Sequence, residues 1–242
     1  MNRGLNIHKE VSNYLKFIVK NYEYTTLAKI IKKNDNDLNN MFPVLVEFIQ
    51  VLWALELYEE HENISSEVKN FLTKIRIVYL RLLYVYPLND DFIVEAILRQ
   101  ISENVLKTLF LIETPGKNIE EVTKMSYRAL WDTNLKKSNM YVNYKKELDY
   151  FNNLFKIGSD ILHAKYEIDG VKQLSDRYEN NTPYDYQKIR KLNKNLKHFL
   201  FNIIEESFFI NESENFTINQ KNRKKQCLAK ISKKDIMKKI SK

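Results

Sequence analysis

The chain has 242 residues, which is room for one large domain or two small ones. Apolar residues make up 44% of the chain and charged residues 29%, so it can bury a core and is not disordered throughout. With four Gly and four Pro it lacks the turn residues that β-sandwiches, barrels and nucleotide-binding α/β folds use in numbers. We therefore expect an all-α fold, a multi-helix bundle built as a single domain over residues 1–210.

The net charge of +8 is concentrated at the C-terminal end. Residues 221–242 hold ten Lys or Arg and one Asp, a net charge of +9, which leaves −1 for residues 1–220. This distribution predicts a neutral body and a basic, flexible tail over residues 211–242. Such a tail either adds phosphate affinity, gaining helix on binding, or serves only solubility. Ser232 and Asp235 are suited to cap a short helix that carries Ile236 and Ile240.

The cellular setting is indicated by what the chain lacks. Its one cysteine, Cys227, excludes an internal disulfide framework and a zinc cluster based on cysteine, and we expect a cytoplasmic protein. The N-terminus has no apolar region of the kind a secretory signal needs. The longest apolar region, Met41–Leu57, is interrupted by Glu47 and Glu56 and is shorter than the roughly 20 residues of a bilayer span. We expect no membrane segment.

Helical periodicity dominates the rest of the chain. Apolar residues recur at three- and four-residue spacing in eight segments, over residues 5–20, 24–32, 40–58, 65–85, 90–112, 118–136, 139–166 and 184–209. Pro43 predicts the first turn of the third segment, and Ser65, then Asn89 or Asp90, and then Asn118 predict the N-caps of the next three. Breaking residues separate the segments at 34–40, 87, 115–116 and 180–183. No glycine-rich phosphate loop, His-Glu-x-x-His helix or Gly-x-Ser-x-Gly elbow occurs.

A charged stripe interrupts the segment at 90–112. This segment is apolar on nearly every side, so its helix should lie inside the domain. Arg99, Glu103 and Lys107 follow one another on it at four-residue spacing. Buried charges are costly unless they are paired. The stripe is either a structural ladder of the pairs Glu95–Arg99 and Glu103–Lys107 or the wall of a functional cleft.

A second polar constellation follows in the run from Lys156 to His163. On a helix, Ser159 and His163 lie one turn apart at the edge of an apolar stripe, where an imidazole would be half shielded. Asp160 or Ser159 would fix its tautomer, and the arrangement suits a general acid or base. The alternative is a histidine that only packs. The histidines, His8, His61, His163 and His198, lack ligand spacing, so we expect no metal and no cofactor.

Together these two segments resemble the HEPN-like helical proteins of bacterial defence systems, toxin–antitoxin pairs and mobile elements. The resemblance covers about residues 90–205 and implies a helical bundle, often a homodimer, whose polar cleft binds or cuts RNA. Catalytic members carry an Arg, four to six further residues and a His. Here Lys156, separated from His163 by six residues, takes the place of that Arg, and Arg99 from the other helix would substitute for the missing guanidinium.

The resemblance implies RNA binding and metal-independent endoribonuclease chemistry. His163 would activate the ribose 2′-hydroxyl or protonate the leaving oxygen, and Arg99 or Lys156 would stabilise the charge on phosphorus, with Glu103 in the same site. The alternative is a non-catalytic factor that binds another protein through a helical face, as an antitoxin-like or phage-interference protein does.

The last long helix is amphipathic, with a basic side. Its apolar residues fall within about one third of the circumference, and basic residues gather opposite them. With two lysines of the tail they predict a surface for a nucleic-acid backbone, formed by Arg190, Lys191, Lys194, Lys197, Lys224 and Lys225. The alternative is a solvated basic face, because no aromatic residue interleaves with these lysines to stack bases.

Overall fold

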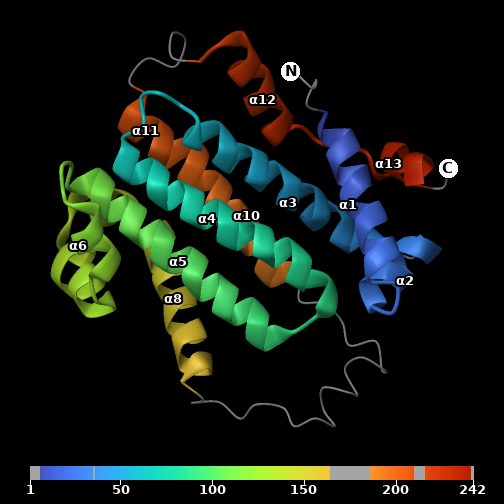
Figure 1. Ribbon diagram of the computed structural model, residues 1–242, viewed down its shortest axis with the longest axis horizontal. Helices are drawn as coiled ribbons and strands as arrows, with labels where there is room; N and C mark the ends of the chain where they lie inside the picture. The colour runs from blue at the N-terminus through green and yellow to red at the C-terminus, as the bar shows by residue number, and fades with distance from the viewer. Residues whose placement is uncertain (1–5, 35, 164–185, 210–215, 241–242) are drawn as a thin grey trace.

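A computed structural model describes residues 6–34, 36–163, 186–209 and 216–240. Within these ranges the regular structure is helical and contains no strand (Figure 1). The all-α fold predicted from the scarcity of Gly and Pro is confirmed.

Three long helices form the central layer: α3 (Asp37–Glu59), α4 (Ser66–Val85) and α5 (Asp91–Glu113). They lie side by side in chain order because short connections join them, including the 3₁₀ turn η1 (Tyr86–Leu88) (Figure 1). Behind α3 and α4 runs α10 (Tyr186–His198), which continues as the π-helix η4 (Phe199–Ile204) and α11 (Glu205–Phe208). Along α5 packs α8 (Lys145–Leu162).

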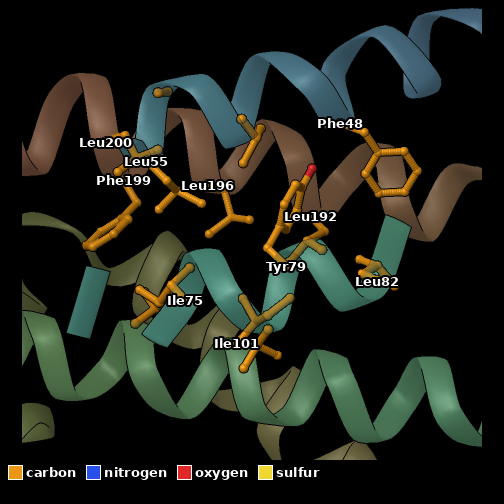
Figure 2. Close-up of a cluster of buried hydrophobic side chains, with 14 of the residues drawn as sticks. Phe48, Leu55, Ile75, Tyr79, Leu82, Ile101, Leu192, Leu196, Phe199 and Leu200 are labelled. Carbon is orange, nitrogen blue, oxygen red and sulfur yellow. The ribbon is translucent and has the colours of Figure 1, made fainter. Parts of the chain in front are cut away.

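The core lies between this layer and α10. Figure 2 shows side chains of α3, α4, α5 and α10 meeting there, among them Phe48, Leu55, Tyr79, Ile101 and Leu196, which have no exposed surface. Burial of each such side chain stabilises the fold by roughly 1.5–3 kcal/mol. The α3 helix is long and apolar enough to cross a membrane, but 78% of its most apolar 18-residue window is buried. That burial is typical of the core helix of a globular protein.

Capping residues start the helices largely where the sequence predicts. Ser65, Asp90 and Asn118 each accept a backbone N–H at the start of the following helix. The prediction for Pro43 is wrong. The α3 helix begins at Asp37, so Pro43 lies inside it, where the missing N–H removes one helical hydrogen bond near the end.

The region after α5 is more broken than its periodicity predicts. The expected single helix over 118–136 is α6 (Ile119–Lys124), the π-helix η2 (Ala129–Asn134) and the 3₁₀ turn η3 (Leu135–Lys137). Met125 ends α6 in an extended conformation. The next predicted helix divides at Tyr144 into α7 (Asn139–Asn143) and α8. Its end at 166, and the predicted break at 180–183, lie outside the described residues.

The structure corrects the expectation of a flexible C-terminal tail. Residues 216–240 include α12 (Ile218–Leu228), which packs on α3 (Figure 1). They also include α13 (Lys233–Ile240), which packs on α1 (Ile7–Asn21). The α1 helix in turn contacts α2 (Thr26–Lys33). Cys227 and Ile236 have no exposed surface. The Nη1 and Nη2 atoms of Arg223 donate to Glu60 and Glu56, each at 2.8 Å. The basic charge is thus partly matched by acidic residues of α3, a pairing that charge counting along the chain does not reveal. The predicted short helix at Ile236 is confirmed.

Candidate functional site

Arg99 is positioned by a neighbouring helix. From α5 its Nε donates to Oγ of Ser159 on α8 at 2.9 Å, and its guanidinium carbon lies 4.6 Å from the centroid of the Phe155 ring. The Ser159 hydroxyl in turn donates to the carbonyl of Phe155 at 2.8 Å. The side chain of Arg99 is 28% exposed. Arg99 is therefore held in one orientation and still reaches solvent.

The charged stripe is a partly exposed ladder of ion pairs. Glu103 lies 3.8 Å from Arg99 and 2.7 Å from Lys107. Lys107 Nζ also donates to the carbonyl of Thr123 at 2.8 Å. The Lys107 side chain is 6% exposed and that of Glu103 is 30% exposed. The expected pair of Glu103 and Lys107 is confirmed, and the stripe lies at the edge of the core.

The expected pair of Glu95 and Arg99 is wrong. The buried carboxylate of Glu95 binds Lys188 of α10 instead, and its Oε2 has no hydrogen-bond partner among the described residues. Arg99 turns to α8. Arg99 and Glu95 have different partners because of the tertiary packing. The α8 helix lies beside Arg99, and α10 lies beside Glu95 in the N-terminal half of α5.

Gly158 explains why α5 and α8 approach so closely. A Cβ atom at this position would lie 2.6 Å from Cβ of Arg99 and 2.8 Å from the carbonyl oxygen of Glu95. Only a glycine leaves room for the two helix backbones at this point. The sequence contains Gly158 within the predicted constellation, but its role depends on the partner helix.

His163 caps the C-terminal end of α8. Its N–H bonds to the Ser159 carbonyl at 3.0 Å, and its side chain is exposed, which corrects the expected half-shielding. Because α8 advances by 100° per residue, Lys156, Ser159 and His163 lie within about 60° of one another. Arg99, bonded to Ser159, thus lies on the side of α8 that carries Lys156 and His163, and Lys156 is exposed.

Of the six residues predicted to contact nucleic acid, four are exposed and two are held by acceptors of the fold. Arg190, Lys191 and Lys194 are exposed on α10, and Lys225 is exposed on α12. Lys197 points inward, where its Nζ donates to Oε1 of Gln50 at 2.6 Å, and burial lowers its pKa. Lys224 binds the buried carboxylate of Glu205 at 2.7 Å. Lys197 and Lys224 therefore have structural roles, because α3 and α11 place acceptors beside them.

A seam between α8 and α10 adds residues that the sequence did not indicate. Lys191 Nζ lies 5.3 Å from the centroid of the Tyr150 ring, and Nδ1 of His198 lies 3.6 Å from Oε1 of Glu147. The order of these contacts shows that the two helices run antiparallel. We call Lys191, Lys194, His198, Tyr150 and Glu147 the basic seam. An aromatic ring does accompany these lysines, contrary to the sequence-based expectation, because it comes from another helix.

Tyr150 is the aromatic residue of the basic seam. Its hydroxyl is buried and has no hydrogen-bond partner in the part of the chain that the structure describes. Burial, and the nearby carboxylate of Glu95, raise the pKa of Tyr150 well above its usual range. Tyr150 therefore stays neutral and acts as an aromatic support for Lys191.

A surface groove lies on another side of the molecule, between α1, α3 and α4. It has a volume of about 340 Å³ and is lined mainly by apolar side chains, including Phe17, Leu52 and Tyr84. A second shallow groove between α4 and α5 shares Tyr84 and includes Arg81 and Ile93. Leu80 lines the first groove and Tyr84 lines both, and these two side chains, which we call the apolar ridge, are 39% and 49% exposed.

Within the described residues, no group of three or more His, Cys, Asp or Glu side chains is arranged to hold a metal ion. No protein-family model, curated protein or solved structure matches this chain, so its function has to be inferred from the geometry above.

Proposed function

We propose that the protein binds the sugar–phosphate backbone of single-stranded RNA along the basic seam, as a HEPN-like defence or toxin-type protein would. The observation that carries this proposal is the exposure of Arg190, Lys191 and Lys194 on one side of α10, next to Tyr150. Exposed cations attract phosphates, and an aromatic surface beside them favours unpaired bases. Lys156 and Arg99 extend the positive charge toward the end of α8.

Cleavage of the bound RNA is the second half of the proposal. It requires a cation that stabilises the charge on phosphorus and a group that takes the proton of the 2′-hydroxyl. Arg99, held at Ser159, and the exposed His163 supply these two groups at one end of the surface.

Charge reversal tests the binding half. The variant Arg190→Glu/Lys191→Glu/Lys194→Glu should weaken binding of a short single-stranded RNA by about 10-fold or more and reduce the slope of log affinity against log salt by about 2. The matched control reverses three exposed lysines of α2, Lys29, Lys32 and Lys33, and so changes the net charge equally. Fluorescence anisotropy over a salt series measures both.

Loss of affinity in the α10 variant alone supports the proposed surface. No RNA binding by the wild type at low salt, or an equal loss in both variants, contradicts it. Circular dichroism should give the same helical spectrum for all three proteins, because the substituted side chains are exposed.

The apolar grooves favour a second candidate function, self-association through α4. Large apolar patches on a soluble surface mark interaction sites. The occupant that fits is a second copy of the chain, because Glu10 lines one groove, Arg81 lines the other, and neither has an ion-pair partner among the described residues. A two-fold axis along the ridge would pair each Arg81 with Glu10 of the partner copy.

A charge swap tests this second candidate by light scattering and sedimentation. Arg81→Glu should weaken the dimer, and Arg81→Glu/Glu10→Arg should restore it. A wild-type protein that stays monomeric contradicts self-association and leaves the grooves to a different protein, as in the non-catalytic alternative.

A further inference from the structure

The groove between α1, α3 and α4 combines aromatic walls with acidic charge. Its volume of about 340 Å³ falls within the roughly 300–1,000 Å³ that is usual for small-molecule pockets. Four aromatic side chains line it: Tyr14, Phe17, Trp53 and Tyr84. Among its described lining residues the charged ones are Glu10 and Glu56, both acidic, on a chain whose net charge is +8. We call this pocket the acidic groove.

Two helices each contribute one face to the acidic groove. On both α1 and α3, four lining residues follow one another at the spacing i, i+3, i+4 and i+7, which places them on one side of the helix. These residues are Glu10, Asn13, Tyr14 and Phe17 on α1, and Ile49, Leu52, Trp53 and Glu56 on α3. The α4 helix completes the groove. The pocket is therefore a regular product of helix packing and not an accident of one side chain.

Aromatic rings meet in a corner at one end of the acidic groove. The ring centroids of Phe17 and Tyr84 lie 5.5 Å apart, and the two rings are nearly perpendicular at 88°. Phe17 also lies 5.6 Å from the ring of Tyr22. Because Tyr84 is 49% exposed, its ring is still accessible from solvent. This corner offers an aromatic surface to the apolar part of a ligand.

One carboxylate of the acidic groove lies toward its other end. The helices α3 and α4 run in opposite directions, and Glu59 near the end of α3 pairs with Arg76 in the middle of α4 (Figure 1). Tyr84 follows Arg76 by two helical turns, toward the N-terminal part of α3. Glu56, one turn before Glu59, therefore lies away from Tyr84. Its Oε2 accepts a hydrogen bond from Arg223 at 2.8 Å, so its charge is already matched.

Glu10 is the carboxylate that is available to a ligand. It precedes Phe17 by seven residues, or roughly 10 Å along α1. It is partly exposed, and within the part of the chain that the structure describes it has no ion-pair partner. The acidic groove thus has an aromatic corner at one end and an uncompensated negative charge two helical turns away.

Aromatic side chains also accompany this charge. Tyr14 lies one turn after Glu10 on α1, and Trp53 lies one turn before Glu56 on α3. Both are held in place, because Trp53 is 6% exposed and the Tyr14 hydroxyl donates to the carbonyl of Leu83 at 2.8 Å. Aromatic ring faces attract cations, those of Trp most strongly. Side chains that are fixed before binding lower its cost.

We infer that the acidic groove binds a small organic cation, a quaternary or protonated amine that carries an apolar group. The positive group lies against Tyr14 and Trp53 and is balanced by Glu10, and the apolar group lies at the corner of Phe17 and Tyr84. This inference does not depend on RNA binding. It also gives the groove a different occupant from the second copy of the chain considered above.

A pair of probes separates charge from apolar contact. Phenylpropyl-trimethylammonium carries the cation, and phenylpropanol has a neutral hydroxyl in its place. Isothermal titration of the full chain should show the charged probe binding about 10-fold more tightly than the neutral one. Equal affinities for the two probes, or no binding of the charged one, overturn the inference.

Substitution of Glu10 tests the source of this preference. Glu10→Gln should weaken binding of the charged probe by about 5-fold or more and change binding of the neutral probe by less than about 2-fold. An unchanged affinity for the neutral probe also shows that the groove is intact. The matched control is Glu121→Gln, which removes the same charge from an exposed position on α6 and should leave both affinities unchanged. An equal loss in the two variants reduces the effect to net charge and overturns the inference.

Two further variants locate the ligand. Tyr84→Leu should weaken both probes by a similar factor, because it removes a ring from the corner that holds the apolar group. Of the two tryptophans, Trp53 lines the groove and Trp131 lies on η2. A change in fluorescence on binding should therefore persist in Trp131→Phe. Its loss in that variant places the ligand elsewhere and contradicts the assignment.

The competing occupant and the RNA surface give distinct outcomes. If a second copy fills the groove, Arg81→Glu should dissociate the dimer and raise the affinity for the charged probe, which overturns the inference in favour of self-association. With a free groove, Arg81→Glu leaves this affinity unchanged. The reversal of Arg190, Lys191 and Lys194 should also leave it unchanged, so failure of RNA binding and failure of cation binding are measured separately.

Discussion

A single methyl group at Gly158 should separate the two helices that assemble Arg99 and Ser159. The Cβ of Gly158→Ala would lie 2.6 Å from Cβ of Arg99 and 2.8 Å from the carbonyl oxygen of Glu95, contacts well below those that real Cβ atoms make. Neither atom can turn away by a side-chain rotation, because one is backbone and the other is attached to it. The helices α5 and α8 must therefore move apart along their shared interface.

The size of the effect follows from two opposing contributions. Overpacking of this kind costs about 1–3 kcal/mol, and Ala in a helix interior is more favourable than Gly by about 1 kcal/mol. We expect a net loss in the free energy of unfolding of up to about 2 kcal/mol, which lowers the Tm of a chain of this size by up to about 8 °C.

Thermal melts followed by circular dichroism measure this loss. Asn153→Ala is the control on the same helix, because Asn153 is exposed, and it should change the free energy of unfolding by less than about 0.5 kcal/mol. A Tm of Gly158→Ala at or above that of the wild type would refute the close approach of α5 to α8, and with it the placement of Arg99 at Ser159.

Three further changes test other parts of the fold. Glu103→Ala should lower the free energy of unfolding by about 1–2 kcal/mol in urea, because Lys107 loses a charged partner and keeps only a carbonyl. Deletion of residues 217–242 should cost about 3 kcal/mol or more in thermal melts, because Cys227 and Ile236 are fully buried. Burial raises the pKa of Glu47 above its ordinary value of 4.5. The stability that protonated Glu47 contributes is therefore fully present below pH 4.5 and is lost as the pH rises through the pKa of the folded state. Melts should therefore show Glu47→Gln gaining stability relative to the wild type between about pH 4 and pH 7.

Each of these has an outcome that contradicts it. A loss below about 0.5 kcal/mol for Glu103→Ala would make the stripe an ordinary surface pair. A truncated protein with the wild-type Tm would restore the flexible tail that charge counting predicts. A constant difference in Tm between Glu47→Gln and the wild type across this pH range would mean that burial does not shift the titration of Glu47.

Local sequence signals predict the elements of this fold well. Side chains at three- and four-residue spacing mark α1 to α5, and Ser65 and Asp90 accept the N–H groups that begin α4 and α5. These signals act within one helical turn, so they can be recognised without knowing what packs against the helix. The misplaced start at Pro43 and the break at Met125 show the limit of such signals. Favourable packing retains a proline inside α3, and the extended backbone of Met125 ends α6 despite an apolar pattern that continues.

The candidate sites were decided by tertiary structure. Spacing identifies Arg99 as a charged residue on a nearly apolar helix, but its partner, Ser159, comes from a different helix. Tertiary structure also decides the position of the tail. Arg223 forms ion pairs with Glu56 of α3 and with Glu60 at its C-terminal end, so the segment expected to be a flexible arm is a docked helix. Helix formation depends on residues three and four apart, whereas these contacts depend on which faces of distant helices meet. That choice is made by the shape of the packed core, in which α5 leaves no room for a Cβ atom at Gly158 of α8.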